Sequence, residues 1–88
     1  MTYKIIIKSK KIFERDFSSI PYQYQKIISQ KIQDLSHTGV FQSQVKKLTH
    51  YKICDYRLRV WDYRVLFVID EKKRYIIIFR ILHRSKLY

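Results

Sequence analysis

Three arginines lie on two neighbouring predicted strands in the second half of the sequence. Arg57 and Arg59 stand two residues apart in YRLRV, and Arg64 follows in WDYRVLFVID. With WD as a two-residue turn, Arg59 pairs with Arg64 and all three side chains share one face of the sheet. Like charges opposite each other destabilise a sheet, and a phosphate held between planar guanidinium groups would offset that repulsion. The pattern therefore predicts a phosphate-binding face, with a solvated basic face as the alternative.

A second polar cluster, HRSKLY, ends the sequence directly after the apolar run YIIIFRIL. One polar residue is enough to end a strand, so this richer ending points to a further role. Arg84 and Lys86 supply positive charge for phosphate oxygens, and a histidine such as His83 can act as an acid near neutral pH. The alternatives are a frayed basic tail, and simple packing of His83 at a strand end.

The net charge is strongly positive, at +12 over 88 residues, from 19 Lys and Arg against 7 Asp and Glu. Self-repulsion on this scale weakens a small domain unless an anionic partner relieves it, which makes nucleic acid the first candidate partner. An acidic protein or an anionic membrane surface would also fit, whereas solubility alone needs less charge. We expect one domain, residues 1–88, with a packed core, because 47% of the residues are hydrophobic.

Metal, disulfide and membrane roles find little support in the sequence. Cys54 is the single cysteine, so no disulfide is expected and a reducing cytoplasm is the natural compartment. His37, His50 and His83 lack the spacing of a metal site, and we expect neither metal nor cofactor. No apolar run approaches the about 20 residues of a membrane span, and the N-terminal stretch lacks the long apolar core of a signal peptide. These features predict a cytoplasmic protein.

The elements that position these residues follow from hydrophobic periodicity. Residues 3–8 alternate with period two, which predicts a strand. Apolar residues then recur every three or four positions from Lys10 and again after Pro21, which predicts two helices. Pro21 suits the first turn of the second helix, and Gly39 suits the position after its end. We interpret residues 40–55 as a short helical turn and loop.

The last part of the sequence, YRLRV, WDYRVLFVID and YIIIFRIL, predicts three consecutive strands joined by short turns. The predicted order is β-α-α-β-β-β, which belongs to the α+β class. We expect an antiparallel sheet of about four strands, with the N-terminal helical hairpin packed on one face.

Across nearly its whole length the sequence resembles the RelE/ParE superfamily of bacterial toxins, and within it the RelE-like messenger-RNA endoribonucleases. The segment KKLTHYKICDYRLRVWDYRVLFVID is similar to the family pattern KKL…YRLRVGDYRVIYxID, and HRSKLY is similar to the terminal GHRxxVY. The opening, MTYKIIIKSKKIFERDFSSIP, resembles the first strand and helix of the family. Two departures fall at predicted turns: Trp61 stands where the family commonly has Gly, and Leu82 where Gly often precedes the His-Arg pair.

The resemblance implies a toxin that cuts messenger RNA in the ribosomal A site and so inhibits translation. In that reaction the ribose 2′-hydroxyl attacks the neighbouring phosphate, which builds charge on phosphoryl oxygens and requires proton transfer. The catalytic residues carried over to this sequence are Arg59, Arg64, Arg84 and Tyr88. Further RNA contacts are expected from Arg57, Trp61, His83 and Lys86. Arg64 and Arg84 would hold the scissile phosphate, with Tyr88 as base or orienter. Trp61 would stack on a nucleobase or cover the sheet edge.

Several points stay open on the sequence alone. Proton transfer by His83 or His50 is undecided. A ParE-like protein with the same fold would inhibit DNA gyrase without cutting RNA, and a plain RNA-binding module would bind without cutting. Both toxin hypotheses imply a small acidic antitoxin, because an acidic partner would neutralise the basic surface.

Overall fold

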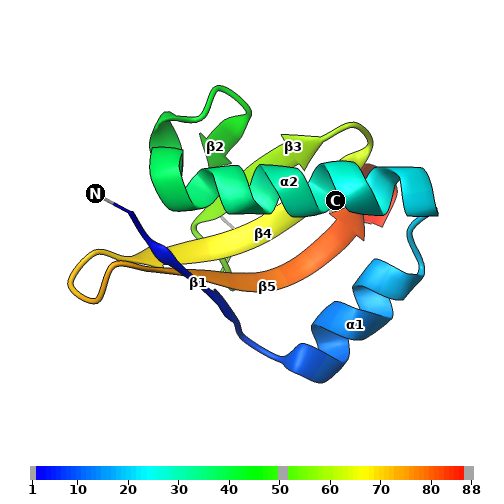
Figure 1. Cartoon of the computed structure of the whole chain (residues 1–88), viewed down its shortest axis with the longest axis horizontal. Helices are drawn as coiled ribbons and strands as arrows, with labels where there is room; N and C mark the ends of the chain where they lie inside the picture. Colours follow the sequence, from blue (N-terminus) through cyan, green and yellow to red (C-terminus); the bar gives the residue numbers. More distant parts are fainter. Residues whose placement is uncertain (1, 50–51, 87–88) are drawn as a thin grey trace.

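The computed structural model describes residues 2–49 and 52–86, which form two α-helices and a five-stranded sheet. The elements in chain order are β1 (Lys4–Ile7), α1 (Lys10–Ser18), α2 (Tyr22–Thr38), the 3₁₀ turn η1 (Gly39–Phe41), β2 (Val45–Lys47), β3 (Tyr56–Val60), β4 (Tyr63–Asp70), β5 (Tyr75–His83) and the 3₁₀ turn η2 (Arg84–Lys86). Helix α2 lies across one face of the sheet, and α1 lies beside the far end of β5 (Figure 1). The expected α+β class is confirmed.

The sheet is mixed, with strand order β1-β5-β4-β3-β2. Strands β3, β4 and β5 form the antiparallel meander that the sequence predicts. Strand β1 joins the other side of β5 in parallel, with Lys4 opposite Tyr75 and Ile7 opposite Ile78. We expected an antiparallel sheet of about four strands. The sheet instead has five strands, and one of them, β1, is parallel to its neighbour. Parallel strands need a long crossover connection, and here the rest of the fold supplies it.

The additional strand, β2, lies in the segment interpreted as helical turn and loop. Only Gly39–Phe41 form a helical turn, whereas Val45–Lys47 pair antiparallel with β3, with Val45 opposite Leu58. The N–H of Leu48 donates to the carbonyl of Asp55 at 2.8 Å and prolongs this pairing. Strand β2 has three residues and only its first is apolar, so it has too few positions to reveal a period of two.

Both helices begin and end at residues suited to these positions. The Ser9 hydroxyl accepts a hydrogen bond from the Ile12 N–H at 3.3 Å and caps α1. Pro21 is the N-cap of α2, one position before the first turn where it was expected. Gly39 ends α2 as predicted, with φ of 54°, and a Cβ there would lie 3.1 Å from the Tyr3 ring. A left-handed φ beside that ring explains why glycine stands here.

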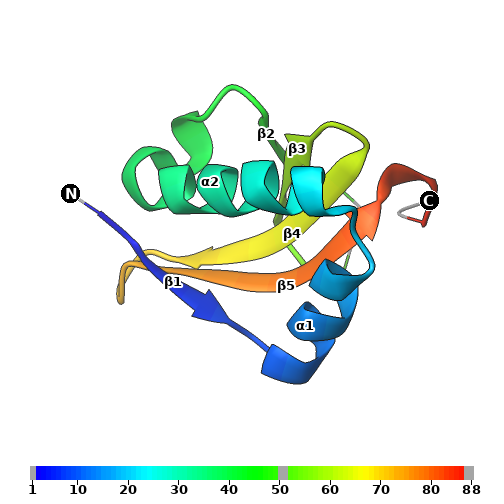
Figure 2. The same ribbon diagram turned by 45° about the vertical axis from the view of Figure 1, so that its right-hand side comes forward.

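One apolar cluster fills the space between α2 and the sheet. Helix α2 contributes Ile28, Ile32 and Leu35, and the sheet contributes side chains from three strands: Leu58, Val60, Val65, Phe67, Ile76, Ile78 and Ile81. Phe13 and Phe17 of α1 pack against the same cluster. Figure 2 shows α2 on one side of β4 and β5, with α1 below the end of α2 and near β5.

A β-bulge sets which side chains of β5 enter this core. Leu66 lies opposite Arg80 but Phe67 lies opposite Ile78, so Phe79 is the extra residue. Without the bulge, a strict period of two would place Arg80 on the same face as Ile78. The extra residue shifts the alternation, so Ile81 points into the core and Arg80 points to the opposite face.

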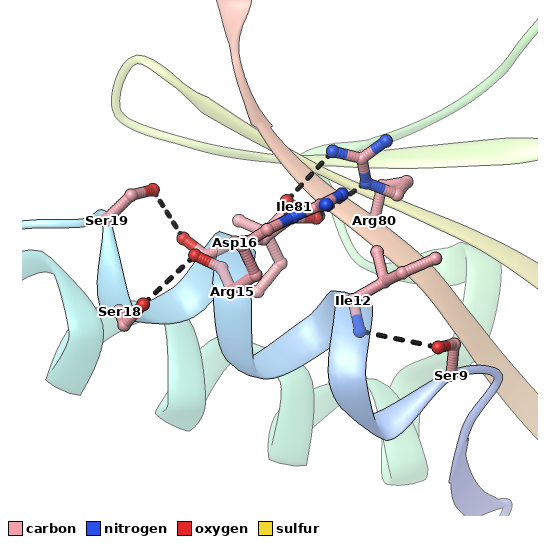
Figure 3. A network of polar contacts seen from close by, with 8 residues as sticks. All are labelled: Ser9, Ile12, Arg15, Asp16, Ser18, Ser19, Arg80 and Ile81. Carbon is pink, nitrogen blue, oxygen red and sulfur yellow. Dashed lines mark hydrogen bonds and ion pairs between the residues drawn. The ribbon is translucent and has the colours of Figure 1, made fainter.

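Helix α1 covers the part of β5 that β1 leaves unpaired. Strand β1 ends opposite Ile78, and beyond it the Ile81 N–H donates to the Asp16 carboxylate at 3.1 Å. The Arg80 guanidinium donates to both oxygens of the same carboxylate, at 2.7 and 2.9 Å (Figure 3). Burial alone would raise the pKa of Asp16, but the hydrogen bonds from Arg80 and Ile81 outweigh it and hold this pKa below its ordinary value.

Candidate nucleic-acid interface

The β3–β4 hairpin has the register predicted from the sequence. Val60 lies opposite Tyr63 and Arg59 lies opposite Arg64, so Trp61 and Asp62 form the two-residue turn. Trp61 has φ of 56°, a left-handed conformation that glycine adopts without steric cost. This geometry accounts for the glycine at the equivalent position of the resembling family pattern. Trp61 adopts this conformation in the two-residue turn at the steric cost that a Cβ brings.

Arg57, Arg59 and Arg64 share the sheet face opposite α2, which we call the arginine face. The residues that alternate with them, Leu58, Val60 and Val65, belong to the core beneath α2. In the part of the chain that the structure describes, no carboxylate lies within ion-pair distance of Arg57 or Arg59. Directly opposite residues have Cβ atoms about 5 Å apart, so the side chains of Arg59 and Arg64 leave the sheet side by side.

Arg64 and Arg84 meet at the hairpin turn. One terminal nitrogen of Arg64 donates to the carbonyls of Trp61 and Tyr63, at 2.9 and 3.0 Å. The backbone N–H of Arg84 donates to the carbonyl of Asp62 at 2.7 Å, which fixes the start of η2 against the same turn. The structure thus brings the two arginines predicted to hold a phosphate to a single turn.

The side chain of Asp62 also contacts Arg84, which the sequence reasoning did not predict. Its carboxylate lies 3.5 Å from Arg84 Nε, and both side chains are exposed. Position 62 was recognised only as part of a turn. The pairing depends on the register between β4 and β5, where Tyr63 lies opposite His83, and that register places position 84 beside position 62.

His83 is on the core side of the sheet and not on the arginine face. His83 pairs with Tyr63, whose side chain packs against the core, and the two rings meet edge to face with centroids 5.5 Å apart. Its Nδ1 lies 2.9 Å from the Ser85 hydroxyl. His83 and Lys86 both line a cleft of about 230 Å³ between the end of α1 and the end of β5. The structure therefore places His83 on the other side of the sheet from Arg57, Arg59 and Arg64.

Trp61 extends from the turn and is 63% exposed. Its ring lies 6.1 Å from the ring of Tyr24 at the start of α2, a tilted aromatic contact. This contact covers only part of the indole, so most of its surface faces solvent at one end of the hairpin. Tyr88 and His50, the other two candidates from the sequence, lie outside the described residues.

Arg80 joins the arginine face, which the sequence reasoning missed. It lies opposite Leu66, a fully buried residue that in turn lies opposite Arg57. The bulge at Phe79 places it there, and the bidentate contact with Asp16 neutralises much of its charge. An arginine within the apolar run YIIIFRIL was the available signal, because a charged side chain would not enter a core.

Other chemistry finds no support among residues 2–49 and 52–86. No group of three metal-ligating side chains lies close enough together to hold a metal ion, and no helix has the length and apolar character needed to span a bilayer. Cys54 is buried, and this burial, together with the charge of Asp55, raises the pKa of its thiol to about 11.

The sheet, the two helices and the arginine-rich hairpin define a toxin of the RelE/ParE superfamily. A family model described as the ParE toxin of the type II toxin–antitoxin system parDE matches residues 7–88. The chain belongs to this family, and it is a toxin of a type II toxin–antitoxin system. Comparison with curated protein sequences gives no match.

Solved structures of RelE proteins have the same fold. RelE in the archaeal RelE–RelB complex of Pyrococcus horikoshii is 27% identical, with a TM-score of 0.78 over 98% of this chain and 99% of that one. The RelB–RelE complex of Methanococcus jannaschii gives 26% identity and a TM-score of 0.70 over 94% of both chains. A doubly substituted Escherichia coli RelE in the free state is 11% identical, with a TM-score of 0.74 over 99% of this chain and 88% of that one, a likeness of fold alone.

Proposed function

We propose that this toxin is a ribosome-dependent endoribonuclease that cuts messenger RNA in the A site and thereby inhibits translation. The observation that carries the proposal is the gathering of cationic groups around one hairpin. Arg57, Arg59 and Arg64 share one face, and Arg84 is bound to the turn of the same hairpin. Several guanidinium groups around a phosphate suit a reaction that accumulates charge on phosphoryl oxygens.

The proposed roles follow from position. Arg64 and Arg84, at the turn, stabilise the scissile phosphate as the 2′-hydroxyl attacks it. Arg59, directly opposite Arg64, assists there, and Arg57 holds the RNA backbone beside it. Tyr88 is assigned as base or orienter for the 2′-proton, because it follows Arg84 closely along the chain. Arg64 and Arg84 need to turn their side chains from the hairpin carbonyls and Asp62 towards the phosphate.

Dependence on the ribosome follows from the size of the chain. Eighty-eight residues leave little room for a catalytic site together with a deep cleft that selects an RNA sequence, and Arg59 itself lines a hollow of about 350 Å³ beside Trp61. Proton transfer needs a positioned acid and base. We propose that the A site, a cytoplasmic target, holds the messenger against this face, so naked RNA is cut poorly.

An acidic antitoxin is the proposed resident partner. The relatives from Pyrococcus horikoshii and Methanococcus jannaschii were solved as complexes of RelE with RelB. The net charge of +12 favours a partner of opposite charge, which would neutralise the arginine face and block RNA. The same charge favours rapid, salt-sensitive association with ribosomal RNA.

Inhibition of DNA gyrase is the second candidate function, because the matching family model is that of the ParE toxin. In that case the same face would bind a protein or DNA surface, and no RNA would be cut. The two functions make opposite predictions for purified components. Mapping RNA ends on programmed ribosomes, beside a gyrase supercoiling assay, tests both. We expect new messenger ends at the A-site codon with unimpaired supercoiling. Intact messenger with blocked supercoiling would overturn the proposal.

A further inference from the structure

Strand β2 extends the arginine face by one strand, and it carries a lysine next to one of the arginines. Lys46 lies directly opposite Arg57 in the β2–β3 pairing. Opposite residues of an antiparallel pair project from the same face, so Lys46 stands on the arginine face and not on the side covered by α2. Its side chain is exposed.

The pairing register extends this observation into a row across four strands. Lys46 lies opposite Arg57, Arg57 opposite Leu66, and Leu66 opposite Arg80. Leu66 is fully buried, and Arg80 is bound to Asp16. Lys46 and Arg57 are therefore the two residues of this row that offer positive charge to a ligand. The positive surface therefore continues from the hairpin turn outward to the edge strand β2.

We infer that Lys46 is a further RNA-binding residue, which contacts a backbone phosphate next to the scissile one and positions the strand. This inference rests on the proposed function of the arginine face. Adjacent strands are about 4.8 Å apart, so Lys46 on β2 stands about 10 Å from the strand that carries Arg64. That separation is too large for both side chains to serve one phosphate from fixed positions. An ammonium group is a point charge on a flexible stem, which suits a flanking phosphate better than the bidentate grip at the reacting one.

Lys47 provides a matched control within the same strand. It has the same charge and is also exposed, but it lies opposite Tyr56, whose side chain packs against the core beneath α2. Lys46 and Lys47 therefore differ in the face they occupy and hardly at all in chemistry. Glutamine at either position removes the charge and keeps most of the stem.

The experiment compares Lys46→Gln and Lys47→Gln with the wild-type chain in two assays. The first is the salt dependence of binding to a single-stranded RNA oligonucleotide. Each phosphate contact on a single strand contributes about 0.7 to the slope of log K against log salt, so Lys46→Gln should lower the slope by about that amount and Lys47→Gln should not. The second is single-turnover cleavage on programmed ribosomes. There Lys46→Gln should raise the half-saturating ribosome concentration about 2- to 5-fold and leave the maximal rate unchanged, as for a solvent-exposed ion pair.

Equal slopes and equal half-saturation for the two variants would overturn the inference. A fall in the maximal rate of Lys46→Gln without a change in half-saturation would overturn it too, because the lysine would then serve the chemical step. The binding assay needs no cleavage, so the two claims fail separately. If the wild-type chain binds RNA without cutting it and only Lys46→Gln lowers the slope, the nuclease proposal fails, whereas the assignment of Lys46 as a contact of the RNA backbone holds.

Discussion

Asp16 of α1 binds Arg80 of β5 through two hydrogen bonds of 2.7 and 2.9 Å, although 64 residues separate them in the sequence. The same carboxylate accepts the N–H of Ile81 and so takes the place of a neighbouring strand along this edge of the sheet. One side chain thereby fixes a helix against β5, and it orients an arginine on the face proposed to bind RNA.

Removal of this carboxylate should destabilise the fold. In Asp16→Ala the buried N–H of Ile81 and the Arg80 guanidinium lose their acceptor, and an unsatisfied buried donor costs about 1–3 kcal/mol. We expect the free energy of unfolding to fall by that amount in urea denaturation followed by circular dichroism. Asp34→Ala serves as the control, because this half-buried carboxylate of α2 accepts one hydrogen bond, from the exposed Gln30 of the same helix. An equal loss in both variants would remove the special role of Asp16.

Acid should unfold the wild-type protein partly through Asp16. Its pKa is lowered in the folded state, so its contribution to stability is present above the unfolded value of 3.8 and is lost as pH falls through the folded value. The free energy of unfolding should therefore fall more steeply below about pH 3.8 in the wild type than in Asp16→Asn. Denaturation curves measured from about pH 6 down to about pH 2 check this. Parallel curves for the two proteins would contradict it.

Phosphate contacts on the arginine face should be visible in salt titrations. Loss of one contact in Arg57→Ala is expected to reduce the slope of log K against log salt by about 0.7 for single-stranded RNA. Lys72→Ala, in the β4–β5 turn, removes the same charge far from this face and should leave the slope near that of the wild type. If both variants change the slope equally, the effect reflects net charge and the face is a solvated surface.

Trp61 allows a test of base stacking with little disturbance of the turn. Asparagine tolerates the left-handed conformation that position 61 requires, so Trp61→Asn should keep the hairpin and remove the indole. Stacking of one base on an aromatic ring is worth about 1–3 kcal/mol, so RNA affinity should fall about 10-fold if the ring stacks. Fluorescence-anisotropy titration measures this, and thermal unfolding confirms the fold. Unchanged affinity would contradict base stacking, and the indole would then have only its packing contact with Tyr24.

The parts of the fold that strong periodicity defines could be predicted from the sequence. YRLRV is β3 to the residue, and the WD turn placed Arg59 opposite Arg64 as expected. The two runs with helical spacing are α1 and α2, and Gly39 ends α2 as predicted. In each case the side chains within one short segment determine the local structure.

The rest depends on pairings between distant segments, which local patterns do not report. Strand β2 is too short and polar to be seen alone, and its pairing with β3 is what places Lys46 on the arginine face. The bulge at Phe79 reverses the alternation of β5 and carries Arg80 to the same face. His83 lies on the core side of the sheet because it pairs with Tyr63, and its contact with RNA stays a prediction.

The most direct test of the central claim is single-turnover cleavage of messenger on saturating programmed ribosomes. The wild type should be compared with Arg84→Ala, Tyr88→Phe and the double variant. Lys72→Ala is the control, and its cleavage rate should equal that of the wild type. Loss of one preorganised charge-stabilising group typically costs about 10² to 10³ in rate, so Arg84→Ala should slow cleavage by at least that factor. Tyr88→Phe should also collapse the rate, and the double variant should lose less than the product of the two if both residues serve one step. Rates near wild type in both single variants, or no messenger cleavage by the wild type itself, would contradict the account.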